Sequence, residues 1–341
     1  MSVEKKFGKP FGNLNSMKRN FFENNDGMLA MADEMAGVLS AQPKRTHCKI
    51  CKSPLSAPLF YSHGLGYIEC TNCGHLNSEF EDTDVFASKV YVEDDYSKNY
   101  SSSDREEYEK RITSIYVPKA EFLKESLQKE GIENIQILDI GAGCGYFVAA
   151  ARRLGMRAMG VELSENQVNY GNAMAEEEIL THVGLTDSIG FIRNTDANVV
   201  SAIGVLEHLI HLDENLSAVR DNPNIQYLYA SVPMFSFSTA FEAANQHCYN
   251  RHTGGTHTHL FSNRSVAYMA ESIGFTVAYE WRFGSDINDL YRFLTVSMAK
   301  NDNEAFAAYF SDRFVPLMDK LQLILDESEF SSELHFILKR K

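Results

Sequence analysis

The sequence predicts an α/β fold around a mostly parallel sheet, preceded by a small cysteine-bearing module. From residue 118 onward, short apolar strands alternate with stretches of helical period, which is typical of βαβ units with crossover helices. Upstream, two CxxC pairs stand eighteen residues apart, a spacing typical of zinc ribbons. A chain of 341 residues also suits about two domains.

The charge balance excludes several kinds of partner. The chain carries 46 acidic and 32 basic residues, a formal net charge of −14, which argues against nucleic acid and anionic membranes as partners. No apolar run approaches the length of a membrane span, and the first residues lack the apolar stretch of a signal peptide. We therefore expect a cytoplasmic protein that binds neither nucleic acid nor membranes.

We divide the chain into four segments on composition. They are an N-terminal extension (1–46), a zinc ribbon (47–85), a connector rich in Tyr, Asp and Ser (86–117) and an α/β domain (118–341). The strands expected in the last segment are 135–140, 157–162, 197–205, 225–233, 275–283 and 334–341. A helical insertion, about 286–330, separates the last two strands.

The two CxxC pairs predict a metal site. Each pair turns two thiolates toward one point, and together Cys48, Cys51, Cys70 and Cys73 complete a tetrahedral shell for Zn²⁺. A shell of four thiolates leaves no open position, so we expect a structural metal. A redox dithiol and a nucleic-acid-binding ribbon remain alternatives, although acidic residues between 79 and 84 oppose the second.

The segment LDIGAGCGYF (138–147) predicts a nucleoside-binding turn after the first strand of the sheet. Gly141, Gly143 and Gly145 let a ligand approach the backbone, but Tyr146 breaks the dinucleotide pattern and no phosphate-loop ending follows. Glu162 ends the next strand, where a carboxylate can accept hydrogen bonds from ribose hydroxyls. A tight turn with a solvated strand end is the alternative.

Three segments together resemble the class I S-adenosylmethionine-dependent methyltransferases. They are LDIGAGCGYFVAAARRLGMRAMGVELSENQVNYG (138–171), SAIGVLEHL (201–209) and HTHLFSNRSVAYMAESIGF (257–275). The resemblance implies a Rossmann-like sheet of seven strands with a reversed last hairpin. It also implies S-adenosylmethionine as the cofactor, bound by Asp139, Gly141, Ala142, Gly143, Glu162, Leu163, Gly204 and Val205, with Asp187 as the acid after the third strand.

The upstream region is similar to that of zinc-bearing sugar methyltransferases, including C-methyltransferases of polysaccharide and natural-product pathways. The similarity consists of two CxxC pairs, then a tyrosine- and serine-rich segment from Tyr96 to Ser103, then the methyltransferase core. It implies that residues 86–117 cap the active site and that Tyr96 and Tyr100 close over the cofactor. The implied substrate is a nucleotide-linked sugar or another sugar-bearing metabolite.

The loop after the fifth strand is expected to hold the substrate, and it is rich in histidine. Four of the eleven histidines fall within residues 247–259, and a base that works near neutral pH is most often histidine. His247 and Tyr249 are our first candidates for base and oxyanion donor, followed by His208, Glu207 and His259. A second metal site built from these histidines is an open alternative.

The sequence thus predicts methyl transfer to a small molecule, with carbon or oxygen of a sugar as the acceptor. Transfer to oxygen or nitrogen of a non-sugar molecule keeps the same fold and is the first alternative. A ribbon protein that binds a partner and retains a non-catalytic cofactor pocket is the second. Intact Gly141, Gly143 and Glu162 argue against the latter.

Overall fold

The computed structural model describes residues 3–9, 24–92, 104–254 and 257–341. Its main sheet has eight strands in the order β1-β11-β12-β9-β8-β5-β6-β7. They are β1 (Glu4–Phe7), β5 (Gln136–Ile140), β6 (Arg157–Glu162), β7 (Leu180–His182), β8 (Val199–Ile203), β9 (Tyr227–Pro233), β11 (Phe275–Phe283) and β12 (Glu333–Arg340). The sheet is parallel from β9 to β7, whereas β12 runs antiparallel to both β9 and β11.

The expectation of seven strands is wrong by one. β1, from the N-terminal extension, pairs in parallel with β11 and becomes the edge strand of the sheet. Its polar sequence, EKKF, carries no apolar alternation, and its exposed pattern fits an edge position. The sequence pattern also did not place β7, whose three residues are too short to show a period.

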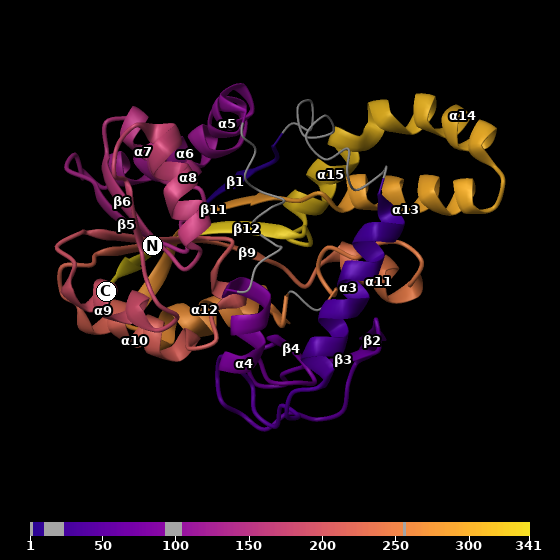
Figure 1. Ribbon diagram of the computed structural model, residues 1–341, viewed down its shortest axis with the longest axis horizontal. Coiled ribbons are helices and arrows are strands. Elements are labelled where there is room, and N and C mark those ends of the chain that lie inside the picture. Colours follow the sequence, from indigo (N-terminus) through magenta and orange to yellow (C-terminus); the bar gives the residue numbers. More distant parts are fainter. Residues whose placement is uncertain (1–2, 10–23, 93–103, 255–256) are drawn as a thin grey trace.

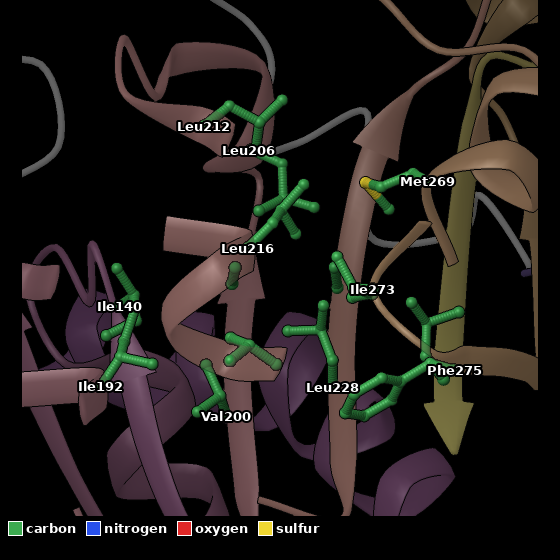
Figure 2. Close-up of a cluster of buried hydrophobic side chains, with 14 of the residues drawn as sticks. Ile140, Ile192, Val200, Leu206, Leu212, Leu216, Leu228, Met269, Ile273 and Phe275 are labelled. Carbon is green, nitrogen blue, oxygen red and sulfur yellow. The ribbon is translucent and has the colours of Figure 1, made fainter. Parts of the chain in front are cut away.

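Helices cover both faces of the sheet because its strands alternate side chains between two apolar layers (Figure 1). One layer packs on α9 (Asp187–Asn194), α10 (Leu212–Asp221) and α12 (Asn263–Ser272), and Figure 2 shows part of it. The other packs on α5 (Arg105–Arg111), the π-helical turn η3 (Ile112–Tyr116), α6 (Val117–Lys129), α7 (Tyr146–Arg153) and α8 (Glu165–Ala175). The carboxyl ends of β5, β6 and β8 remain open between these layers.

The cysteine module is a second sheet, and a strand from far along the chain completes it. Its strands β2 (Phe60–Ser62), β3 (Leu65–Glu69) and β4 (Leu76–Ser78) are joined by β10 (His259–Leu260), which pairs with β4. Helix α3 (Asn25–Ser40) packs its Leu39 on this sheet. The short helices α4 (Asp84–Ala87) and η1 (Ser88–Val92) lead away from it.

A buried carboxylate, Asp82, connects the same module to the main domain. Asp82 forms ion pairs with Lys49 and Arg45 and accepts a hydrogen bond from Thr258 Oγ1 at 3.1 Å. Because Thr258 directly precedes β10, one carboxylate joins the module to the segment that follows β9. The cysteine module therefore packs against the segment that follows β9.

The chain between β11 and β12 is helical. It consists of α13 (Asp286–Lys300), α14 (Glu304–Phe314), the 3₁₀ turn η5 (Val315–Leu317) and α15 (Met318–Glu327), and α13 and α14 extend away from the sheet (Figure 1). Helix α13 contacts α11 (Phe237–Ala244), the helix that follows β9. Within the described ranges, no helix is long and apolar enough to cross a membrane.

Candidate active site

A cavity of about 340 Å³ lies at the carboxyl ends of β5, β6 and β8. In parallel sheets this edge collects the loops that bind ligands. Eight of the cofactor residues expected from sequence line it: Asp139, Gly141, Ala142, Gly143, Glu162, Leu163, Gly204 and Val205. The local glycine motif and two strand ends therefore meet in one place.

Gly141 shows why the turn after β5 excludes a side chain. Its φ is +62°, and a Cβ atom there would lie 2.8 Å from Val205 Cγ2. Glycine is the residue that adopts this conformation without strain. The backbone of β5 and the loop after β8 can thus approach each other and leave the cavity open between them.

Glu162 holds the glycine turn from the neighbouring strand. Its Oε2 accepts a hydrogen bond from Gly143 N at 2.8 Å, and its Oε1 accepts one from Ser164 N at 2.9 Å. Each carboxylate oxygen retains a second lone pair. The carboxylate is therefore both oriented by backbone donors and able to accept hydrogen bonds from a ligand in the cavity.

Asp139 lies at the end of β5 and is buried. Ser201 Oγ donates to its Oδ1 at 2.6 Å. Burial raises the pKa of this carboxyl to about 7, and the charge of Glu162 acts in the same direction. A bound cation or amino group would therefore find a carboxyl here that gains by pairing with it.

Other cofactor residues expected from sequence lie elsewhere. Asp187 is exposed at the start of α9, where its Oδ2 accepts from Gly184 N at 2.8 Å, and it does not line the cavity. Tyr96 and Tyr100 fall outside the described residues. The two ends of the connector do reach the cavity, since Ala87 and Tyr116 both line it.

Several polar residues line the cavity in addition to those predicted from the sequence. They are Tyr116, Gln167, Ser188, His211 and Asn215. Gln167 lies inside the methyltransferase-like segment, so its place in the first turn of α8 was a usable signal. Tyr116 stacks on Tyr146 with ring centroids 5.3 Å apart. This contact joins two separate segments, so no local sequence pattern predicts it.

Glu207 and His208 lie in the short turn η4 (Leu206–His208) after β8, and His208 lines the cavity. His208 Nε2 lies 3.8 Å from Glu207 Oε1. Burial raises the pKa of Glu207 to about 8, and the charge of Glu333 adds to the effect. His257, from the segment before β10, packs against His208 with ring centroids 5.0 Å apart.

The structure separates the remaining catalytic candidates from the cavity. His247 is exposed, and its carbonyl oxygen accepts hydrogen bonds from Asn25 Nδ2 and Lys300 Nζ. Tyr249 is held nearby through its backbone N–H, which donates to Asn25 Oδ1. His259 is buried in β10, where its Nδ1 lies 2.9 Å from His75 Nε2. None of these three lines the cavity.

The four module cysteines converge as a metal site requires. Cys48 Sγ lies 3.6 Å from Cys73 Sγ, and Cys51 Sγ lies 3.4 Å from Cys70 Sγ. All four sulfurs lie within 4.8 Å of one another. A tetrahedral Zn–S₄ centre with Zn–S bonds of about 2.3 Å has sulfurs about 3.8 Å apart, so the arrangement fits that metal.

A family model described as a methyltransferase domain matches residues 109–280, half of the chain. The chain belongs to this methyltransferase family. The match contains the glycine turn, Glu162, Glu207 and His208, so the cavity lies inside the methyltransferase domain. The prediction of an S-adenosylmethionine-dependent methyltransferase is confirmed.

Individual relatives of this methyltransferase are distant. A probable fatty acid methyltransferase of Mycobacterium tuberculosis is 33% identical over 76 residues, which are 22% of this chain and 18% of that protein. The magnesium protoporphyrin IX methyltransferase of Synechocystis, solved with bound S-adenosylhomocysteine, has 13% identity and a TM-score of 0.44, covering 71% of this chain and 91% of that one. A methyltransferase of Archaeoglobus fulgidus has 18% identity and a TM-score of 0.41, covering 65% and 94%.

Proposed function

We propose that this methyltransferase acts on a sugar-bearing small molecule, with a nucleotide-linked sugar as the first candidate. When bound, S-adenosylmethionine supplies an activated methyl group. The observation that carries the proposal is the β4–β10 pairing, which places the cysteine module against the segment that follows β9. The resemblance to sugar methyltransferases implies that this segment binds the substrate and that the module belongs to the same group of enzymes.

In this proposal the chain holds its cofactor with residues that fit it chemically. Glu162 accepts hydrogen bonds from the ribose hydroxyls, since its carboxylate is already oriented by Gly143 and Ser164. Asp139 and the turn at 141–143 receive the methionine end, whose amino group pairs with the buried carboxyl. Apolar Leu163, Val183 and Leu185 line the part of the cavity suited to the adenine ring.

The acceptor belongs at the Glu207–His208 end of the cavity. A hydroxyl or carbon acid has to lose a proton before it becomes a nucleophile. Of the catalytic candidates, His208 lines the cavity, and Glu207 Oε1 lies 3.8 Å from its Nε2. The chain otherwise contributes alignment, because an activated methyl group mainly requires the acceptor in the correct position. We therefore transfer the catalytic role from His247 to this pair.

Two lysines, Lys9 and Lys119, lie near Glu333. Lys119 Nζ lies 3.6 Å from Glu333 Oε1, and both residues are close enough to Glu207 to shift its pKa in opposite directions. Burial and the charge of Lys119 lower the pKa of Lys9 to about 8. Neither lysine lines the cavity, and Lys119 is paired with Glu333, so no group of the acceptor is assigned to them.

The cysteine module contributes structure in this proposal. Cys48, Cys51, Cys70 and Cys73 hold Zn²⁺, and the metal fixes the hairpin that pairs with β10. No chemistry is assigned to this ion, because four thiolates leave it no open position.

The direct test is mass spectrometry of sugar nucleotides incubated with the protein and methyl-labelled S-adenosylmethionine. A labelled mass gain on a sugar nucleotide is the expected result, and fragmentation of the product separates carbon from oxygen methylation. Label that appears only on a non-sugar panel would replace the proposed substrate class. Tight cofactor binding without turnover on either panel would favour a binding module.

A further inference from the structure

Three side chains from two distant segments converge beside the cavity, and one of them, His208, lines it. Glu207 and His208 come from η4, and His257 comes from the segment before β10. One ligand atom of each, a carboxylate oxygen or a ring nitrogen, lies within 4.8 Å of the other two. In the described part of the chain, the cysteine cluster is the other group of this kind.

Two of the atoms in this cluster are buried acceptors without a donor. Neither Glu207 Oε2 nor His257 Nδ1 has a hydrogen-bond partner. Buried polar atoms nearly always have one, so two such atoms in a single cluster require an explanation. A metal ion between Glu207 Oε2 and His257 Nδ1 would give both atoms a partner.

The ring of His257 is prepared to act as a ligand. It hydrogen-bonds to the backbone of His252. Since Nδ1 has no partner, the proton lies on Nε2 and the Nδ1 lone pair is available. A neutral imidazole oriented through its other nitrogen is typical of metal-binding histidines.

We propose that Glu207, His208 and His257 bind a divalent transition-metal ion at the acceptor end of the cavity. Two imidazoles and one carboxylate suit ions from Mn²⁺ to Zn²⁺, and three protein ligands leave further coordination positions open. His208 lines the cavity, so an open position of the ion faces the place proposed for the acceptor.

Second contacts support the position of His257. His252 Nδ1 lies 3.0 Å from Glu242 Oε1, and this fully buried carboxylate also accepts hydrogen bonds from the backbone of Arg251 and from Thr253. Residues 251–253 are therefore held to α11 by one carboxylate, and His257 hydrogen-bonds to the backbone of His252. Hydrogen bonds of this kind fix the direction of a metal ligand.

The neighbouring cations are paired with carboxylates other than Glu207. Arg251 Nε pairs with Asp289 Oδ2 at 2.8 Å, and Lys119 pairs with Glu333. Neither cation is a hydrogen-bond partner of Glu207 Oε2. A bound ion would compensate this carboxylate directly.

This inference rests on the proposed function for its consequence and extends it. An acceptor oxygen bound to a divalent ion releases its proton more easily, as metal-bound water does. Glu207 and His208 would then promote loss of the acceptor proton through the ion that they bind, and this proton would pass to water at the mouth of the cavity. The same ion would orient the acceptor.

The test uses Mn²⁺ as the probe, because carboxylate and imidazole sites accept this ion and thiolate sites disfavour it. Zinc-loaded protein is titrated with Mn²⁺ and followed by electron paramagnetic resonance, without any acceptor. We expect one Mn²⁺ per chain, with affinity at least about tenfold weaker in His257→Ala. His247→Ala, which removes an exposed histidine of the same segment, should bind Mn²⁺ as the unsubstituted protein does.

Zinc content and S-adenosylmethionine affinity report on folding, and Glu207→Gln supplies a nearly isosteric second variant. The metal site would be overturned if the unsubstituted protein bound no Mn²⁺. It would also be overturned if both His257→Ala and Glu207→Gln bound Mn²⁺ as tightly as the unsubstituted protein. The Mn²⁺ titration needs no acceptor, so its result stays valid even if none of the sugar nucleotides is methylated. Conversely, sugar methylation by a protein that binds no Mn²⁺ and resists chelators would leave the proposed function standing and end this inference.

Discussion

The backbone N–H of Gly143 donates to Glu162 Oε2 across 2.8 Å. This contact joins the turn after β5 to the end of β6, two strands that pair in parallel. One carboxylate thereby sets the shape of the glycine turn and presents its remaining lone pairs to the cavity. Turn geometry and ligand recognition are therefore coupled through a single side chain.

Removal of this carboxylate should weaken cofactor binding. We expect Glu162→Ala to raise the Kd for S-adenosylmethionine by about 10- to 100-fold, because hydrogen bonds to a charged group contribute about 1.5–3 kcal/mol. Titration calorimetry measures the change. Glu178→Ala, at an exposed site of the same domain, is the control and should leave Kd within about twofold. An unchanged Kd in Glu162→Ala would remove this residue from the binding site.

Alanine substitutions at two glycines with similar backbone conformations distinguish the effect of backbone strain from that of steric overlap. Gly141 and Gly131 both have positive φ, +62° and +76°, but only at Gly141 would a Cβ meet a neighbour within 4 Å. Gly131→Ala should lower the free energy of unfolding by about 1 kcal/mol through backbone strain, and Gly141→Ala should lower it further because of the overlap with Val205. We expect Gly141→Ala alone to weaken cofactor binding, by about tenfold or more, because Val205 must move.

Thermal unfolding and calorimetry on the two variants give both quantities. Equal losses of cofactor affinity in Gly131→Ala and Gly141→Ala would assign the effect to general destabilisation. If both variants kept their affinity for the cofactor, the turn at Gly141 would be able to accommodate a side chain without any change in the binding site.

The cysteine cluster should contain one zinc ion per chain. We expect Cys51→Ser to lose that metal and to lower the melting temperature, since metal binding to such a shell is coupled to folding of the module. Elemental analysis gives the stoichiometry. Cys248→Ser is the matched control, because Cys248 is also a free cysteine but lies outside the cluster. Equal zinc content in the two variants would contradict the assignment.

Much of the fold follows from the sequence because its signals are local. The strands of the α/β domain are apolar runs, and the glycine turn with Glu162 lies within one βαβ unit. Contacts of low sequence separation of this kind leave a pattern that periodicity and motif spacing detect. The short strands β1 and β7 lack such a pattern, because pairing with a neighbour, and not side-chain alternation, defines them.

The acceptor end of the site could not be predicted in the same way. Clustering of histidines in 247–259 locates a loop but not the direction in which each ring points. Asn25 and Lys300 bind the backbone at His247 on the far side, whereas pairing of β10 with β4 brings His257 beside His208. Both outcomes depend on contacts between residues more than 40 positions apart.

The two histidines therefore make a direct comparison of catalytic roles. We expect His208→Ala to lower turnover by about 10²- to 10⁴-fold, the range for loss of a group that handles a proton in the reaction. His247→Ala should retain turnover within about threefold, since its ring lies outside the cavity. Initial rates at saturating cofactor measure both. Loss of turnover in His247→Ala, with His208→Ala active, would return the role to His247.

Asp326 predicts a pH dependence of stability that is independent of catalysis. This carboxyl is buried on α15, and burial raises its pKa to about 7, with the nearby charge of Asp286 adding to the effect. The folded state therefore prefers the protonated acid. Its contribution to stability is complete below pH about 4, the ordinary range of an aspartate, and falls as the pH rises toward 7.

Asp326→Asn removes this titration. Between pH 5 and pH 8, we expect the free energy of unfolding of the variant to rise relative to that of the unsubstituted protein by about 1–2 kcal/mol. Urea unfolding at the two pH values measures the difference, and comparison across pH cancels the loss of hydrogen bonds caused by the substitution itself. Asp312→Asn, at an exposed site on α14, should show no such change. A constant difference between Asp326→Asn and the unsubstituted protein would mean that the carboxyl is already ionised at pH 5, because Gln322 and Ser331 then stabilise its charge more than burial opposes it.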